Sequence, residues 1–286
     1  MNDKNLHIDQ IKEKSAEFFS KGKIDWNKPE ELVWEELFAR TQKTAPKGKS
    51  VVFPRFYKYA AAVIMLLVIA GTIPFIYTKS VESVPGEHVL ATLPDGSTIE
   101  LNAGSHIKYY PLKWFVQRKV IFEGEAFFQV QKGKKFDVQS KNGTTEVLGT
   151  SFNVYSRDGK YRVTCITGKV KVETVTKQSV ILLPGSQAKL ERGKLVVERN
   201  VITDNIISWK NNQFFFAGTP LHEVIDEIER QYGVTIKIQD ELYNRNFAGN
   251  FPKKYSVEEV LDFVCKTMQV KFVKQSENVF LVVENS

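Results

Sequence analysis

The chain has 286 residues, of which 42% are hydrophobic and 26% are charged. These are ordinary values for folded protein, and the length predicts roughly two domains. The net charge of +7 is spread along the chain, so no direct contact with nucleic acid is expected. The four histidines and the distant cysteines Cys165 and Cys265 lack metal-ligand spacing. We therefore expect no metal site, no cofactor and two buried free thiols.

Residues 1–40 are too few to bury a substantial core alone, and they are predicted to form an α-helical N-terminal stub. Two short helices are expected, the second beginning at Pro29, a favoured first helical position. Their apolar faces either pack on each other or leave a surface for a partner protein. The candidate contact residues are Ile11, Phe18, Phe19, Trp26, Val33, Trp34, Leu37 and Phe38.

Residues 59–77 form a run of 19 residues without a charge, which predicts one transmembrane helix. At about 1.5 Å per residue the run spans roughly 30 Å of hydrocarbon, and it begins too far along the chain for a signal peptide. The linker 41–58 is basic and lacks acids, whereas residues 78–92 hold one lysine and two acids. The positive-inside rule then predicts a single-pass protein of the inner (cytoplasmic) membrane, with a cytoplasmic N-terminus and periplasmic C-terminal domains.

Residues 81–203 are predicted to form a periplasmic all-β domain. Short alternating apolar runs are separated by hairpin dipeptides such as Asp95-Gly96 and Asn142-Gly143. No helical pattern interrupts them. The pattern leaves two architectures open, a sandwich and a solenoid-like stack of strands.

Residues 205–286 contain an internal repeat in which each unit reads as strand, turn, helix and strand, which predicts an α+β domain of two βαβ units. Thr219 is expected to cap the first helix, and Ser256 with Glu259 forms a capping box for the second. A final strand over 279–283 is expected at the edge of the sheet.

No catalytic constellation is present in the sequence, so an enzyme is not expected. The phosphate-binding, dinucleotide-binding and nucleophile-elbow motifs are missing. Glu123 and Glu125 flank Gly124, but Gly124 is interpreted as a turn between strands, and the two acids as solvated.

Aromatic residues at positions 109, 110, 114 and 115 allow an alternative function. They are either core residues or a glycan-binding cluster. In the second case the chain would be a membrane-anchored periplasmic carbohydrate- or envelope-binding module without a signalling role.

Several runs resemble the FecR family of transmembrane anti-sigma factors, in that family's order and spacing. They include LPDGSTIELNAGSHIKYYP (93–111), FEGEAFFQV (122–130), VLGTSFNV (147–154) and ILLPGSQAKL (181–190). The signature positions are Leu93, Pro94, Asp95, Gly96, Ser97, Leu101, Asn102, Gly124, Glu125, Ala126, Phe128, Gly149, Thr150, Phe152, Gly168, Pro184 and Gly185. The C-terminal repeat is similar to the short N-terminal (STN) domain of secretins and TonB-dependent receptors.

The resemblance implies a signalling role. The stub would hold an extracytoplasmic-function (ECF) sigma factor, and the outer domains would contact the signalling domain of a TonB-dependent outer-membrane transporter. The protein would thereby control transcription of uptake genes. Signalling would end in cleavage by site proteases within or beside the membrane segment, where Gly71, Thr72 and Pro74 loosen helical hydrogen bonding. These three residues are equally explained by the ordinary tolerance of membrane helices for Gly and Pro.

Overall fold

The computed structural model describes residue 17, residues 29–43 and residues 57–285. The chain divides into two compact units, residues 1–61 and residues 62–286. In the first unit, helix α2 covers Glu30–Lys43. It begins one residue later than predicted, because Pro29 supplies the carbonyl that accepts a hydrogen bond from the Leu32 amide at 3.0 Å. The predicted first helix lies outside the described residues.

Helix α3 is continuous over Tyr57–Ile76. It runs through Gly71, Thr72 and Pro74, and the Thr72 hydroxyl donates to the Ile69 carbonyl at 3.0 Å. Within the part of the chain that the structure describes, no helix combines the length and apolar character needed to cross a bilayer. The membrane span over 59–77 therefore stays a prediction.

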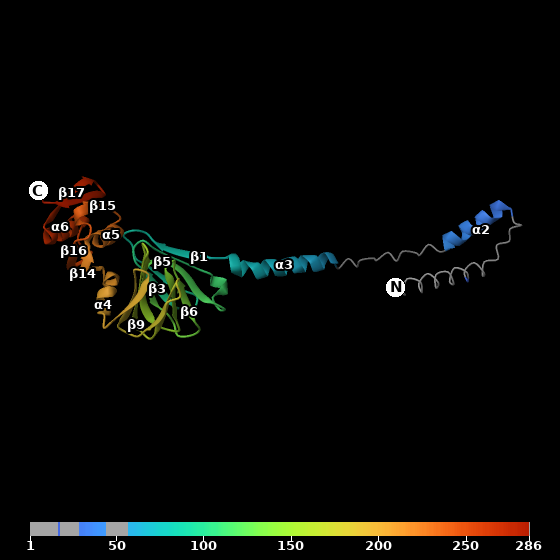
Figure 1. Ribbon diagram of the computed structural model, residues 1–286, viewed down its shortest axis with the longest axis horizontal. Helices are drawn as coiled ribbons and strands as arrows, with labels where there is room; N and C mark the ends of the chain where they lie inside the picture. The colour runs from blue at the N-terminus through green and yellow to red at the C-terminus, as the bar shows by residue number, and fades with distance from the viewer. Residues whose placement is uncertain (1–16, 18–28, 44–56, 286) are drawn as a thin grey trace, which may run out of the picture. The chain divides into compact units, whose positions relative to one another are not determined.

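Thirteen strands follow α3 and form the β domain (Figure 1). Their bounds are β1 Lys79–Ser83, β2 Val89–Thr92, β3 Thr98–Leu101, β4 Ser105–Tyr109, β5 Arg118–Gln129, β6 Phe136–Gln139, β7 Gly143–Val147, β8 Ser151–Arg157, β9 Lys160–Thr167, β10 Val170–Thr174, β11 Ser179–Leu182, β12 Ser186–Glu191 and β13 Lys194–Arg199. One turn of 3-10 helix, η1 (Pro111–Lys113), lies between β4 and β5. The predicted all-β character of this region is confirmed.

Strand β5 belongs to two sheets. Its first half pairs with β4 and β6, and its second half pairs with β3 and β8. Gly124 marks the change, with φ +122°, and a Cβ atom there would lie 2.4 Å from the Ser105 Oγ. The predicted turn at Gly124 is therefore wrong. Glycine lets the strand bend from one sheet into the other without ending.

The two sheets face each other over one core. Buried side chains of both sheets form a single hydrophobic cluster. Phe122 and Phe128, from the two halves of β5, meet edge to face at 5.5 Å, and Phe128 stacks on Phe152 at 5.0 Å. Two facing sheets with a shared core are a sandwich, which decides between the two predicted architectures.

The C-terminal domain follows with its own hydrophobic core. Its elements are α4 Thr203–Ile206, η2 Ser208–Asn211, β14 Gln213–Pro220, α5 Leu221–Tyr232, β15 Thr235–Ile238, η3 Asp240–Leu242, β16 Asn246–Pro252, α6 Val257–Met268, β17 Val270–Ser276 and β18 Val279–Glu284. Their order agrees with two βαβ units and a final strand. β14 pairs with β16, and β15, β18 and β17 form a separate sheet.

The final strand, β18, lies in the centre of its sheet, so the predicted edge position is wrong. It runs parallel to β15 and antiparallel to β17. The reason is burial: Phe280 and Val282 of β18 are 0% and 1% exposed, and a strand this apolar is covered best between two neighbours.

The two long helices of this domain begin differently. The N-cap of α5 is Pro220, without a side-chain cap, and Thr219 belongs to β14, so the predicted Thr219 cap is wrong. The capping box of α6 is confirmed, because the Glu259 amide donates to the Ser256 Oγ at 3.3 Å and the Ser256 amide donates to Glu259 at 2.8 Å.

Candidate functional site

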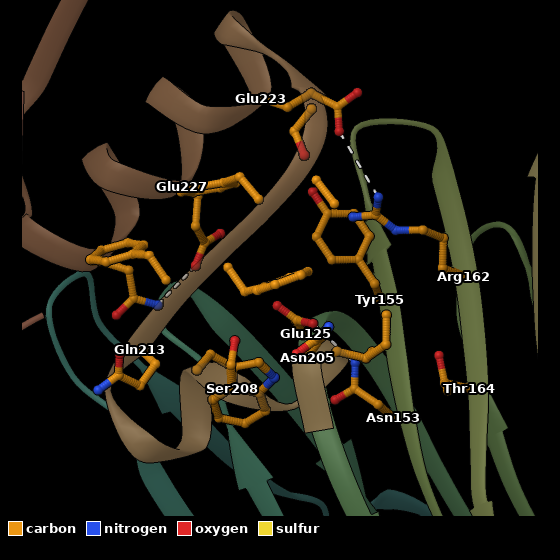
Figure 2. A pocket seen from close by; sticks show the side chains of 18 of the residues that line it. Glu125, Asn153, Tyr155, Arg162, Thr164, Asn205, Ser208, Gln213, Glu223 and Glu227 are labelled. Atoms are coloured by element: carbon orange, nitrogen blue, oxygen red, sulfur yellow. Dashed lines mark hydrogen bonds and ion pairs between the residues drawn. The ribbon is translucent and has the colours of Figure 1, made fainter. Parts of the chain in front are cut away.

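A cavity of about 290 Å³ lies where the β domain meets the C-terminal domain. Figure 2 shows Glu125, Asn153 and Tyr155 of the β domain on one side, and Glu223 and Glu227 of α5 on the other. We refer to the polar side chains that connect the two domains here as the junction cluster: Asn102, Glu125, Asn153, Glu227, Arg230 and Gln231.

Asn102 is the hub of the junction cluster. Its Nδ2 donates to Glu125 at 2.8 Å and to Glu227 at 3.4 Å, and its Oδ1 accepts from the Gln231 Nε2 at 2.6 Å. Asn153 donates to the other oxygen of Glu125 at 2.9 Å. One buried amide therefore connects two carboxylates and two domains.

The two carboxylates of the junction cluster have opposite electrostatic environments. Burial, and then the charge of Glu227, raises the pKa of Glu125. Burial would also raise the pKa of Glu227, but Arg230 and Arg157 outweigh it, so the pKa of Glu227 is lowered. The Arg230 guanidinium lies 2.9 Å from the Glu227 carboxylate, and both side chains are less than one-fifth exposed. Arg230 therefore favours the charged form of Glu227, whereas burial disfavours the charged form of Glu125.

Further contacts across the same boundary surround the junction cluster. Glu223 of α5 pairs with Lys160 of the β domain at 3.1 Å. Lys253, in the turn after β16, donates to the Gly86 carbonyl at 2.8 Å, and the Gly86 amide donates to the Arg230 carbonyl at 2.8 Å. The domains are therefore joined by many specific polar contacts.

The structure separates the two acids that flank Gly124. Glu123 is exposed and pairs with Lys141 at 3.0 Å, whereas Glu125 lies in the junction cluster. The acid beside Glu125 is Glu227, which sequence reasoning missed. The signal was local: Glu227 and Gln231, four residues apart, are polar residues beside the buried stripe of α5. Within the described residues, no three His, Cys, Asp or Glu side chains are placed to hold a metal ion.

Most other signature residues build turns and core. Asp95 accepts from the Ser97 amide at 3.0 Å and pairs with the buried Arg118 at 2.8 Å. Gly168 has φ +76°, and a Cβ atom there would lie 2.5 Å from Thr150. The aliphatic and aromatic members other than proline are buried, and they are Leu93, Leu101, Ala126, Phe128 and Phe152. Asn102 differs from these residues because it contacts Glu227 and Gln231 of the C-terminal domain, and it also donates to Glu125.

The described part of the predicted partner surface lies on α2. Trp34, Leu37 and Phe38 are 54%, 48% and 64% exposed, and the rings of Trp34 and Phe38 are 6.4 Å apart. We call these three residues the α2 apolar face. Val33 is half-buried. The other predicted contact residues, which are Ile11, Phe18, Phe19 and Trp26, lie outside the described residues.

The aromatic cluster does not form one exposed face. Tyr109 and Trp114 are 3% and 2% exposed and belong to the core, whereas Phe115 is 80% exposed. Trp114 packs edge to face against Phe136 at 5.7 Å. The residues that motivated the carbohydrate-binding alternative therefore point in different directions.

Comparison with known proteins finds similarity in both the β domain and the C-terminal domain. Residues 79–171 match the family described as FecR protein, and residues 213–282 match the family described as FecR, C-terminal. Two crystal structures of a candidate anti-sigma factor from Parabacteroides distasonis ATCC 8503 superpose with a TM-score of 0.67 at 29% and 28% identity, covering 73% of this chain and 100% of that one. No curated protein sequence matches the chain. The two family matches lie in the β domain and in the C-terminal domain, and together with the two crystal structures they support an anti-sigma regulator role for this chain.

Proposed function

We propose that the protein binds an ECF sigma factor in the cytoplasm through its N-terminal residues. The observation that carries this proposal is the α2 apolar face, where Trp34, Leu37 and Phe38 stay exposed. Large apolar side chains at a spacing of three and four residues along a helix fit a groove on a partner protein. The similarity to a candidate anti-sigma factor supports a sigma factor as that partner.

In this proposal residues 59–77 cross the inner membrane. The support is their uncharged run of 19 residues and the excess of positive charge in 41–58. The β domain and the STN-like C-terminal domain would then lie in the periplasm. There they receive the signal of a TonB-dependent outer-membrane transporter through its signalling domain. The two-stranded sheet β14–β16 offers edges that could accept a strand from that partner.

In this proposal the signal passes from the C-terminal domain to the β domain through the junction cluster. A partner that binds the C-terminal domain would shift α5. Gln231 of α5 is bonded to Asn102 of the β domain, and Asn102 is bonded to Glu125. β1 of the same domain follows α3 after two residues. Cleavage by site proteases near Gly71, Thr72 and Pro74 would then release the N-terminal residues with their sigma factor.

The test is co-purification of the full-length protein with each affinity-tagged ECF sigma factor of its host. The variant Trp34→Ala/Leu37→Ala removes two side chains of the α2 apolar face. We expect binding to fall roughly tenfold or more, because buried aromatic anchors dominate interface energies. The matched control is Glu31→Ala/Glu35→Ala, which changes two exposed residues of the same helix and is expected to keep binding.

Two results would contradict the proposal. If no sigma factor is retained by the unaltered protein, the sigma-binding role fails. If the Trp34→Ala/Leu37→Ala variant binds as well as the control variant, the α2 apolar face is not the contact. Reporter fusions at both ends of the chain test the membrane crossing separately, since the proposal requires the ends to lie in different compartments.

A further inference from the structure

The end of the β domain beside α3 is defined by strand register. Two residues separate α3 from β1, and Lys79, the first residue of β1, pairs with Tyr109, the last residue of β4. Tyr109 pairs in turn with Val120 of β5. Residues 110–117 connect β4 to β5, and we call residues 111–117 of this connection the 111–117 loop. This loop therefore lies at the end of the sheet where the chain leaves α3, as Figure 1 allows the reader to follow.

The 111–117 loop presents apolar side chains to its surroundings. Leu112, Phe115 and Val116 are 51%, 80% and 86% exposed. Trp114, which lies between them in the sequence, is 2% exposed and packs edge to face against two buried aromatic rings at 5.6 and 5.7 Å. A buried anchor thus holds a short loop in which three apolar side chains are exposed.

Cations accompany these apolar side chains. The Lys113 Nζ lies 3.7 Å from the centre of the Phe75 ring, in the last turn of α3. The Lys134 Nζ donates to the Phe115 carbonyl at 3.4 Å. The loop itself, PLKWFVQ, contains no acid. Exposed apolar side chains with lysines and without acids are typical of segments that insert at the surface of a bilayer containing anionic lipid.

We propose that the 111–117 loop rests on the bilayer from which α3 emerges, with Leu112, Phe115 and Val116 at the level of the lipid headgroups. This inference rests on the membrane crossing in the proposed function. A lipid surface is the occupant that the register favours, because α3 would bring that surface to within two residues of β1. The contact would give the β domain a second attachment point, and hence a defined orientation on the membrane.

The experiment uses the full-length protein in vesicles of phosphatidylethanolamine and phosphatidylglycerol that contain a spin-labelled lipid as quencher. A polarity-sensitive fluorophore is attached to a cysteine introduced by Val116→Cys, Met65→Cys or Val175→Cys. Met65 lies within α3, and Val175 follows β10 at the other end of the same sheet, where it is 64% exposed. Because the two native thiols are buried, the unaltered chain reports background labelling.

We expect the label at Met65 to be quenched by lipid carrying a deep spin label, and the label at Val116 by lipid carrying a headgroup spin label. The label at Val175 should keep its emission with both lipids. Adding Phe115→Asp to Val116→Cys should restore most of the lost emission, whereas adding Lys177→Asp should not. Both added changes lie at exposed positions, so the fold is expected to persist.

The outcomes separate the two proposals. If Met65 is quenched but Val116 is not, the loop does not touch lipid and the inference fails while the membrane crossing stands. If Val116 becomes protected only when a protein partner is added, the occupant is a protein and the inference also fails. If Met65 is not quenched, the membrane crossing in the proposed function fails, and quenching at Val116 alone would show lipid binding without it.

Discussion

Replacing Arg230 by glutamine removes the cation that faces Glu227 at 2.9 Å in the junction cluster. The side chains of Arg230 and Glu227 are 19% and 17% exposed, and breaking a fully buried pair costs about 3–5 kcal/mol. Glu227 can also take up a proton, which at pH 7 costs about 3.7 kcal/mol from an ordinary carboxyl pKa near 4.3. With some screening by the cavity, we expect the free energy of unfolding to fall by about 2–3 kcal/mol.

The loss should depend on pH with a defined sign. The pKa of Glu227 is lowered in the folded protein. Its ion pair therefore stabilises the fold above the ordinary carboxyl pKa, and that stabilisation is lost as the pH falls through the lowered pKa. In the variant Glu227 stays buried but has lost the Arg230 charge, so it takes up a proton at a higher pH than in the unaltered protein. The difference between the unaltered protein and Arg230→Gln should therefore shrink between pH 7 and pH 4.

Urea denaturation followed by circular dichroism measures both effects. The matched control is Lys266→Gln, which breaks an exposed pair with Asp262 on α6 and should cost less than about 0.5 kcal/mol. Equal losses for the two variants would refute the reasoning, as would a loss for Arg230→Gln that grows on acidification.

Two further predictions concern the β domain and the thiols. In a thermal unfolding assay, Gly124→Ala should lower the free energy of unfolding by about 3 kcal/mol or more, because φ is +122° and the new Cβ would lie 2.4 Å from a neighbouring side chain. The control Gly193→Ala, with φ +78° and open space around it, should lower it by only about 1 kcal/mol. Equal losses of stability in the two variants would show that the backbone or Ser105 moves to make room for the new Cβ, and would contradict this prediction. Burial raises the pKa of Cys165 to about 11, and the pKa of Cys265 is raised to about 12 by burial and by Asp262, so iodoacetamide at pH 8 should modify both only after unfolding. Rapid modification of the native protein, followed by mass spectrometry, would contradict this.

Much of the fold could be predicted from local sequence patterns. The apolar stripe of α5 and the capping box of α6 involve residues three or four apart, so helical periodicity predicts them directly. Alternating strands and turn dipeptides likewise predicted an all-β domain. The expectation of two buried free cysteines is confirmed, since each lies in an apolar run that became part of a core.

Register and long-range contacts could not be predicted in this way. The alternation around Gly124 is compatible with a turn, and only the neighbours of β5 show that the strand continues into a second sheet. The position of β18 depends on two strands that a single sequence does not pair. Glu125 and Glu227 are distant in sequence but share the amide of Asn102. The only local signal for Glu227 was that it is a polar residue on an amphipathic helix, which does not predict its neighbours.

The sharing of β5 between two sheets has a mechanical consequence. Each sheet uses half of one strand, so neither sheet can melt completely without removing a neighbour from the other. The sandwich should therefore unfold as one cooperative block, and split-protein complementation with a break at residue 124 should fail where breaks in hairpin loops succeed. Tension applied at one end of the domain would be shared by both layers through a single continuous backbone.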